Sequence, residues 1–89
     1  MSTIHIEIKF FASCRDITNI NSYKMELNGT IEEPATVLVV INKVLELYPD
    51  LEENMNEISI AVNQKYIKDK DTVLNNNDTV AFIPPISGG

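Results

Sequence analysis

The stretch TVLVVINKVLELYP, residues 36–49, decides between two folds for this chain. Its apolar, β-branched beginning is as compatible with a buried strand as with a helix, because short apolar runs carry no distinguishing period. The wider pattern favours a helix that ends at Pro49, since Lys43 and Glu46 fall opposite an apolar stripe. Thr36 is a suitable N-cap for this helix. The predicted stripe consists of Val37, Leu38, Ile41, Val44, Leu45 and Tyr48.

Segments with the two-residue period of strands lie on both sides of this helix. Before it, residues 4–10 alternate apolar and polar side chains, and residues 23–27 do so again up to an Asn-Gly turn. After it, residues 58–62, the short segment 65–67 and residues 79–83 read as three further strands. The intervening segments predicted to be loops are residues 12–17, 50–57 and 68–77.

This order of elements predicts an α+β fold. A mixed sheet with one main helix packed on one face is the ubiquitin-like β-grasp arrangement, and residues 1–89 are expected to form a single domain of this kind. One helix covers one face only, so the other face is open to solvent or to a partner. Strand parity places Phe11 and Ile83 on the open face, where Tyr66 is expected to join them in a docking patch. The alternative for Phe11 is that the strand stops at Phe10 and the next side chain turns inward.

Composition excludes several classes of function. The chain has 89 residues and 44% hydrophobic content, enough for one small core. Its formal net charge of −6 argues against nucleic acid as a partner, because phosphate binding needs clustered lysine and arginine. The same acidity fits plain solubility and contact with a basic protein surface equally well. We expect neither a signal peptide nor a membrane span, and we expect a cytoplasmic location.

Few side chains could carry catalysis or hold a metal. The single cysteine, Cys14, leaves no intrachain disulfide and no Cys-x-x-Cys motif, and the single histidine, His5, cannot build a metal site alone. No histidine can be assigned to Cys14 as a base, so an inert thiol is favoured over a catalytic nucleophile. The chain is therefore not expected to be an enzyme by itself, nor to bind a metal or a cofactor.

Residues 84–89, PPISGG, have the composition of a protruding tail. Two prolines form a stiff spacer after the last strand, and two glycines leave the terminal carboxylate free of neighbouring side chains. Such an end can enter a narrow channel, with the α-carboxylate of Gly89 as the reactive group. The alternative is a frayed end of small residues.

The residues also resemble a known family. The segments IHIEIKFFA at 4–12 with the Arg-Asp pair at 15–16, AVNQ at 61–64, and AFIPPISGG at 81–89 are the parts that carry the likeness. They resemble the small, sulfur-carrier subunits of molybdopterin synthase, a ubiquitin-like family, and the likeness spans the whole chain.

This resemblance implies a function and its partners. An adenylating, activating enzyme would use ATP to activate Gly89, and a sulfur donor would convert it to a thiocarboxylate. The large, catalytic subunit of the synthase would then accept the tail in a hetero-oligomer, where the sulfur passes to a cyclic pyranopterin precursor of molybdopterin. By position Gly88 would line the channel of that subunit. The residues implied in the subunit interface are Phe11, Tyr66, Ile83, Pro84 and Pro85.

Two other functions share this fold and a Gly-Gly end. A sulfur carrier for thiamine or another pathway is one, although such carriers resemble this chain less in the Phe-Ile-Pro-Pro segment. A ubiquitin-like modifier that is conjugated to lysines is the other. The intact mass of the protein from cells separates them, because a thiocarboxylate changes one atom whereas conjugation gives much larger adducts.

Overall fold

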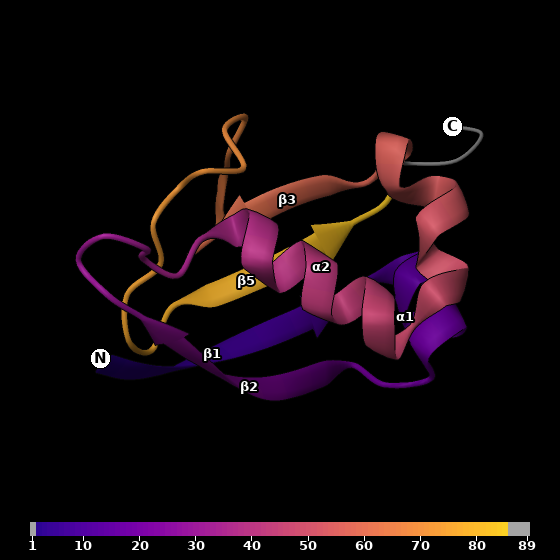
Figure 1. The fold of residues 1–89 in the computed structure, drawn as a ribbon. Helices are drawn as coiled ribbons and strands as arrows, with labels where there is room; N and C mark the ends of the chain where they lie inside the picture. The colour runs from indigo at the N-terminus through magenta and orange to yellow at the C-terminus, as the bar shows by residue number, and fades with distance from the viewer. Residues whose placement is uncertain (1, 86–89) are drawn as a thin grey trace.

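The computed structural model describes residues 2–85, so the sequence predictions for residues 86–89 lie outside the described range. Five strands form one mixed sheet in the order β2-β1-β5-β3-β4, and helix α2 crosses one face of it (Figure 1). This arrangement confirms the predicted α+β, β-grasp fold. The elements in chain order are β1 (Ser2–Phe10), α1 (Ala12–Thr18), β2 (Ser22–Gly29), α2 (Val37–Leu47), the 3-10 helix η1 (Pro49–Glu57), β3 (Ser59–Val62), β4 (Lys65–Tyr66) and β5 (Thr79–Ile83).

Strand β1 lies between β2 and β5 near the middle of the sheet. It runs antiparallel to β2, with Ile6 opposite Met25, and parallel to β5, with Phe10 opposite Phe82. The predicted alternation holds, because Ile6, Ile8 and Phe10 all face the core and are at most 3% exposed. The first and last strands of the chain are therefore direct neighbours.

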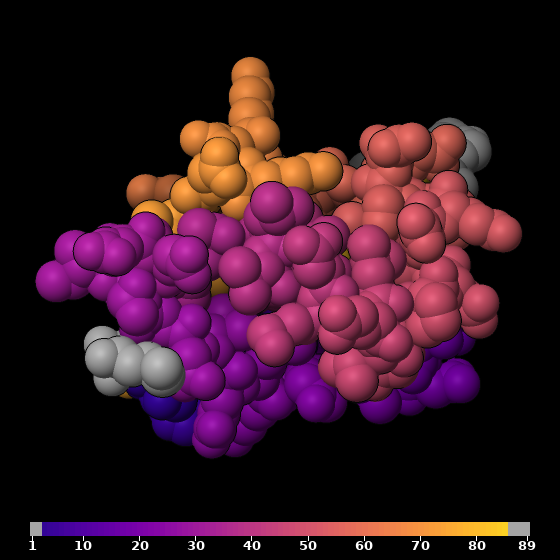
Figure 2. Space-filling model, viewed as in Figure 1, coloured from indigo at the N-terminus to yellow at the C-terminus, as the bar shows by residue number. Residues whose placement is uncertain are grey.

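Helix α2 supplies the other half of the core. The hydroxyl of Thr36 accepts a hydrogen bond from the Val39 N–H at 3.4 Å, which confirms the predicted N-cap. Tyr48 caps the other end directly before Pro49, as the sequence predicted, and the alternative of a strand is wrong. In the space-filling view α2 and η1 cover much of this side of the sheet (Figure 2). The buried side chains of α2 are Val37, Val40, Ile41 and Val44.

The predicted stripe of α2 is wrong at one position. Leu38 is 40% exposed, whereas Val40, which the prediction left out, is fully buried. Every residue in the first turn and a half of the helix is apolar, so the sequence does not show which of them face the sheet. The packing is decided by the later turns, where Val44 faces the core and Lys43 and Glu46 face solvent.

Two of the three segments predicted to be loops are helical. Residues 12–17 belong to α1, and residues 50–57 belong to η1. Each helix is held by buried side chains: Cys14 and Thr18, one turn apart, in α1, and Leu51 in η1. Such short helices depend on tertiary contacts more than on intrinsic propensity, and one or two buried residues give no periodic pattern.

The third predicted loop, residues 68–77, has no regular element and closes over the start of α2. The first N–H groups of a helix have no partner within the helix. Here the Val37 N–H donates to the Thr72 carbonyl at 3.0 Å, and the Leu38 N–H donates to the Lys70 carbonyl at 2.9 Å. The loop therefore satisfies backbone donors that Thr36 alone cannot.

The different burial of two leucines gives a matched test of this fold. Leu51→Ala is expected to lower the free energy of unfolding by about 2 to 5 kcal/mol, because it opens a cavity under η1. Leu38→Ala removes the same atoms from an exposed position and is expected to cost less than about 1 kcal/mol. Urea denaturation followed by circular dichroism measures both. Equal losses for the two variants would contradict the burial described for η1.

Candidate functional site

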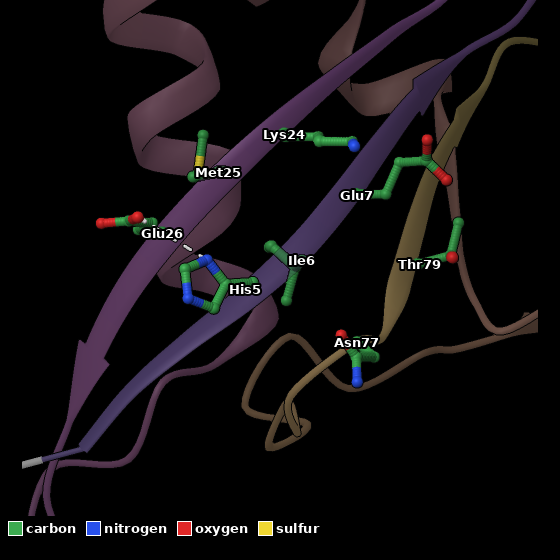
Figure 3. Close-up of a pocket in the computed structure, with 8 residues that line it drawn as sticks. All are labelled: His5, Ile6, Glu7, Lys24, Met25, Glu26, Asn77 and Thr79. Carbon is green, nitrogen blue, oxygen red and sulfur yellow. Dashed lines mark ion pairs between the residues drawn. The ribbon is translucent and has the colours of Figure 1, made fainter.

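The sheet face opposite α2 divides into a charged half and an apolar half. Cross-strand pairing decides which side chains share this face, because residues directly opposite each other point to the same side. The charged half lies on β1 and β2 and carries His5, Glu7, Lys24 and Glu26 (Figure 3). The apolar half lies on β3, β4 and β5 and carries Ala61, Tyr66, Ala81 and Ile83.

A depression of about 450 Å³ lies over the apolar half. Ala61 on β3 is directly opposite Ala81 on β5, and on its other side it is opposite Tyr66 on β4. The two alanines form a floor of small side chains between larger ones. Tyr66 is 70% exposed, so its ring is available to a partner.

Phe11 and Ile83 line the same depression where β1 and β5 end. The Phe11 N–H donates to the Phe82 carbonyl at 3.2 Å, so the chain stays paired to β5 as it leaves β1. Phe11 is 44% exposed and directly precedes α1, so its predicted place on the open face is confirmed and the inward alternative is wrong. The three residues that the sequence singled out for the open face, Phe11, Tyr66 and Ile83, are thus brought together, although their role in an interface stays a prediction.

The segment that follows β5 begins at this depression. Pro84 is half-buried and Pro85 is exposed. Gly88 and Gly89, the predicted reactive end, lie outside the described residues. A molecule that binds the depression therefore lies next to the point where the chain leaves the sheet.

Sequence reasoning did not assign to the docking patch the polar residues around the depression, namely Lys9, Asn63, Gln64 and Thr79. Asn63 connects two of its walls: its side-chain oxygen accepts from the Thr79 N–H at 2.9 Å, and its amide nitrogen donates to Asp78 at 2.8 Å. Asn63 and Gln64 both have positive φ, 50° and 72°, as the two residues of a tight turn between β3 and β4. The Asn-Gln pair in the sequence was the signal for this connection.

A larger depression, of about 590 Å³, lies over the charged half (Figure 3). The His5 Nδ1 lies 3.6 Å from the Glu26 Oε1, with both side chains well exposed. Exposed ion pairs of this kind contribute little to stability. This depression lies over β1, β2 and the start of β5, whereas the tail leaves the sheet at the other end of β5, after Ile83.

The one cysteine does not line either depression. Cys14 is 1% exposed and belongs to the core beneath α1, and burial raises the pKa of its thiol. A protonated, buried thiol is a poor nucleophile. Within residues 2–85, no group of three or more His, Cys, Asp or Glu side chains is placed to hold a metal, and no helix is long and apolar enough to cross a membrane.

The buried thiol predicts slow alkylation. At pH 8, Cys14 in the native protein is expected to react with iodoacetamide at least about tenfold more slowly than in urea, because the side chain is buried and burial raises the pKa of its thiol, which lowers the thiolate fraction. The fold favours the neutral thiol. The difference in alkylation rate between the native and the unfolded protein is therefore largest below the ordinary thiol pKa and declines as the pH rises above it. Mass spectrometry of timed samples measures the rate. Equal rates in both states would show that Cys14 is accessible.

Comparison with known proteins adds to this geometry. Residues 8–89 match the ThiS family. The chain is 34% identical over 84 residues to the molybdopterin synthase sulfur carrier subunit of Dictyostelium discoideum, covering 93% of this chain and 94% of that protein. It is 33% identical to the protein of the same name from Homo sapiens, covering 94% and 93%. The crystal structure of SAMP1 from Haloferax volcanii has a TM-score of 0.82 at 22% identity, covers 96% of this chain and 99% of that one, and shares the fold.

Proposed function

This chain belongs to the ThiS family, and from the relatives that it matches we propose that it is the sulfur carrier subunit of a molybdopterin synthase. Two relatives that carry this name match it over nearly their whole length at 33% and 34% identity. The likeness therefore extends over most of the domain and is not confined to a single motif, and the match to the family covers residues 8–89.

The observation that carries the proposal is the position of the last described strand. Phe82 is fully buried in the core, so β5 is held firmly in the sheet. The next residue, Ile83, lines the apolar depression, and Pro84 and Pro85 follow it directly. A partner on the depression is thereby brought to the tail that carries the chemistry.

The proposed partner on the depression is the large, catalytic subunit of the synthase. Phe11, Tyr66 and Ile83 supply the apolar anchors, with Pro84 and Pro85 continuing the contact along the tail. Aromatic side chains in a hollow are the residues that most often dominate the binding energy of an interface. The rings of Phe11 and Tyr66 are 44% and 70% exposed, so both lose solvent-accessible area when a partner covers them.

The proposed chemistry takes place at the α-carboxylate of Gly89. A carboxylate is a poor electrophile, so an activating enzyme adenylates it with ATP and releases pyrophosphate. A sulfur donor then displaces AMP to give a thiocarboxylate. In the large subunit its sulfur displaces an oxygen substituent of the pyranopterin precursor, and water then cleaves the bond between that sulfur and the Gly89 carbonyl carbon, which returns the carboxylate. Gly88 passes through the channel of that subunit because it has no side chain to obstruct it. The ATP is bound by the activating enzyme and not by this chain.

This chain acts as the sulfur donor and not as the catalyst. Catalysis by a cysteine needs a thiolate within reach of a base. In the described part of the chain the one thiol is buried in the core, whereas His5 is exposed on the open face of the sheet. No residue-based alternative to the tail is present in residues 2–85, which supports a carrier role.

Docking through the depression is tested by two variants of matched exposure. Phe11→Ser is expected to weaken binding to the large subunit by about tenfold or more, the loss expected at an aromatic anchor. Leu38→Ser changes a leucine of similar exposure, 40% against 44%, on the opposite side of the molecule and is expected to leave binding unchanged. Titration calorimetry measures both. Equal affinities for the two variants would place the interface elsewhere.

The role of the tail is tested by changing its length. Deleting Gly89 withdraws the carboxylate by about 3.5 Å, and reacting atoms do not tolerate that displacement. Formation of the thiocarboxylate, followed by intact mass after incubation with activating enzyme, ATP and a sulfur source, is expected to be lost. An alanine added after Gly89 is expected to have the same effect. Binding to the large subunit is expected to survive both changes.

The outcome also separates the competing functions. If the chain lacking Gly89 still acquires sulfur and supports molybdopterin formation, the tail is not the reactive group and the proposal is wrong. Conjugates of the unmodified chain with other proteins, in place of a thiocarboxylate, would identify a ubiquitin-like modifier.

A further inference from the structure

Strand β2 forms a long edge of the sheet. It has eight residues, whereas β4 at the other edge has two. No described residue pairs with the outer side of β2. A free edge of this length presents a row of unpaired backbone N–H and C=O groups and is a template for another strand.

The hydrogen bonds of β1 show which residues of β2 present these groups. The Phe10 N–H donates to the Asn21 carbonyl at 2.9 Å, so these two residues form a hydrogen-bonded pair. Hydrogen-bonded and non-hydrogen-bonded pairs alternate along an antiparallel ladder. The odd-numbered residues of β2 therefore direct their backbone groups to β1, and the even-numbered ones, including Lys24 and Glu26, direct theirs outward.

The side chains of these two residues carry opposite charges on the open face. Lys24 is opposite Glu7 of β1, and Glu26 is opposite His5 (Figure 3). Both Lys24 and Glu26 are exposed. The edge thus offers one positive and one negative side chain, two residues apart, beside the backbone groups that need partners.

We propose that β2 pairs antiparallel with β2 of a second copy of this chain, about a two-fold axis at Met25. In this register Lys24 of each copy lies opposite Glu26 of the other, and both residues form hydrogen-bonded pairs through their outward backbone groups. A row of side chains then crosses four strands, with Glu7 and Lys24 in one copy followed by Glu26 and His5 in the other. The first three of these side chains are negative, positive and negative in turn. The edge is complementary to itself.

The charges select this register over its neighbours. A shift in either direction that keeps the even-numbered residues hydrogen-bonded places Lys24 opposite Lys24, or Glu26 opposite Glu26. Like charges directly opposite each other destabilise a strand pair, whereas opposite charges stabilise it. Only the register centred on Met25 gives two opposite-charge pairs.

The other side of the edge adds apolar contact. Tyr23 is 37% exposed and Leu47, at the end of α2, is 49% exposed, and both line a depression between β2 and α2. In the proposed register Tyr23 lies opposite Leu27 of the second copy. A side-chain seam on this face removes exposed apolar surface that nothing else in the described residues covers.

The dimer is weak and leaves the docking site free. A single pair of eight-residue strands gives an interface at the low end of the size range of specific complexes. The net charge of −6 on each copy also opposes association, although salt at about 0.15 M screens it beyond about 8 Å. The apolar depression on β3, β4 and β5 is separated from β2 by β1, so each copy keeps its proposed partner surface.

Sedimentation equilibrium from about 10 μM to about 1 mM protein, at about 0.15 M salt, tests the proposal. The wild-type chain is expected to form a dimer in the upper part of this range. Lys24→Glu and Glu26→Lys each create two like-charge pairs and are expected to weaken dimerisation at least tenfold. Lys68→Glu makes the same charge change as Lys24→Glu at an exposed loop position and is expected to leave it unchanged.

Two rescues distinguish the register from a general effect of charge. The double variant Lys24→Glu with Glu26→Lys restores opposite charges in the homodimer, and an equal mixture of the two single variants restores them in a heterodimer. Both are expected to associate like the wild type. A monomer throughout the concentration range, a dimer insensitive to both single changes, or a loss that neither rescue repairs would each overturn the proposal. None of these outcomes depends on sulfur transfer.

Discussion

The parallel pairing of β1 with β5 is the constraint on which the rest of the structure depends. It joins segments about 70 residues apart, so closing the intervening loop costs on the order of 4 kcal/mol in chain entropy. The pairing buries Ile8, Phe10, Val80 and Phe82, each contributing about 1.5 to 3 kcal/mol, and the rings of Phe10 and Phe82 lie 5.5 Å apart. Burial therefore outweighs closure, and every other element lies within or beside the loop that this pair closes.

The same pairing decides where a partner can bind. The residues next to the buried phenylalanines, Phe11 and Ile83, come to the surface together because β1 and β5 run in the same direction and end at the same edge. Ala61 and Ala81 then make the hollow beside them, and Asn63 ties the β3–β4 turn to the start of β5. The candidate site is thus built from core strands, with its side chains on rigid backbone and only the tail beyond.

Most of this architecture could be predicted from the sequence, because a two-residue period identifies strands with one buried face. Strand parity alone placed Phe11 and Ile83 on the open face. The short helices could not be recognised in the same way: α1 has no side-chain N-cap and no acidic residue in its first turn, and η1 buries a single leucine, Leu51. The phase of α2 was ambiguous at Leu38 because its neighbours are all apolar. The docking roles and the chemistry at Gly89 stay predictions, since they concern partners and residues outside 2–85.

The direction of β1 relative to β5 also has a mechanical consequence. Because the two strands are parallel neighbours, the start of β1 and the end of β5 lie at opposite ends of the sheet (Figure 1). A force applied between those two points acts along both strands in shear. The hydrogen bonds between them are then loaded together and cannot open one after another, as they would in a hairpin pulled from its open end. Tension on the segment beyond Ile83 is therefore opposed by all the hydrogen bonds between the two core strands at once.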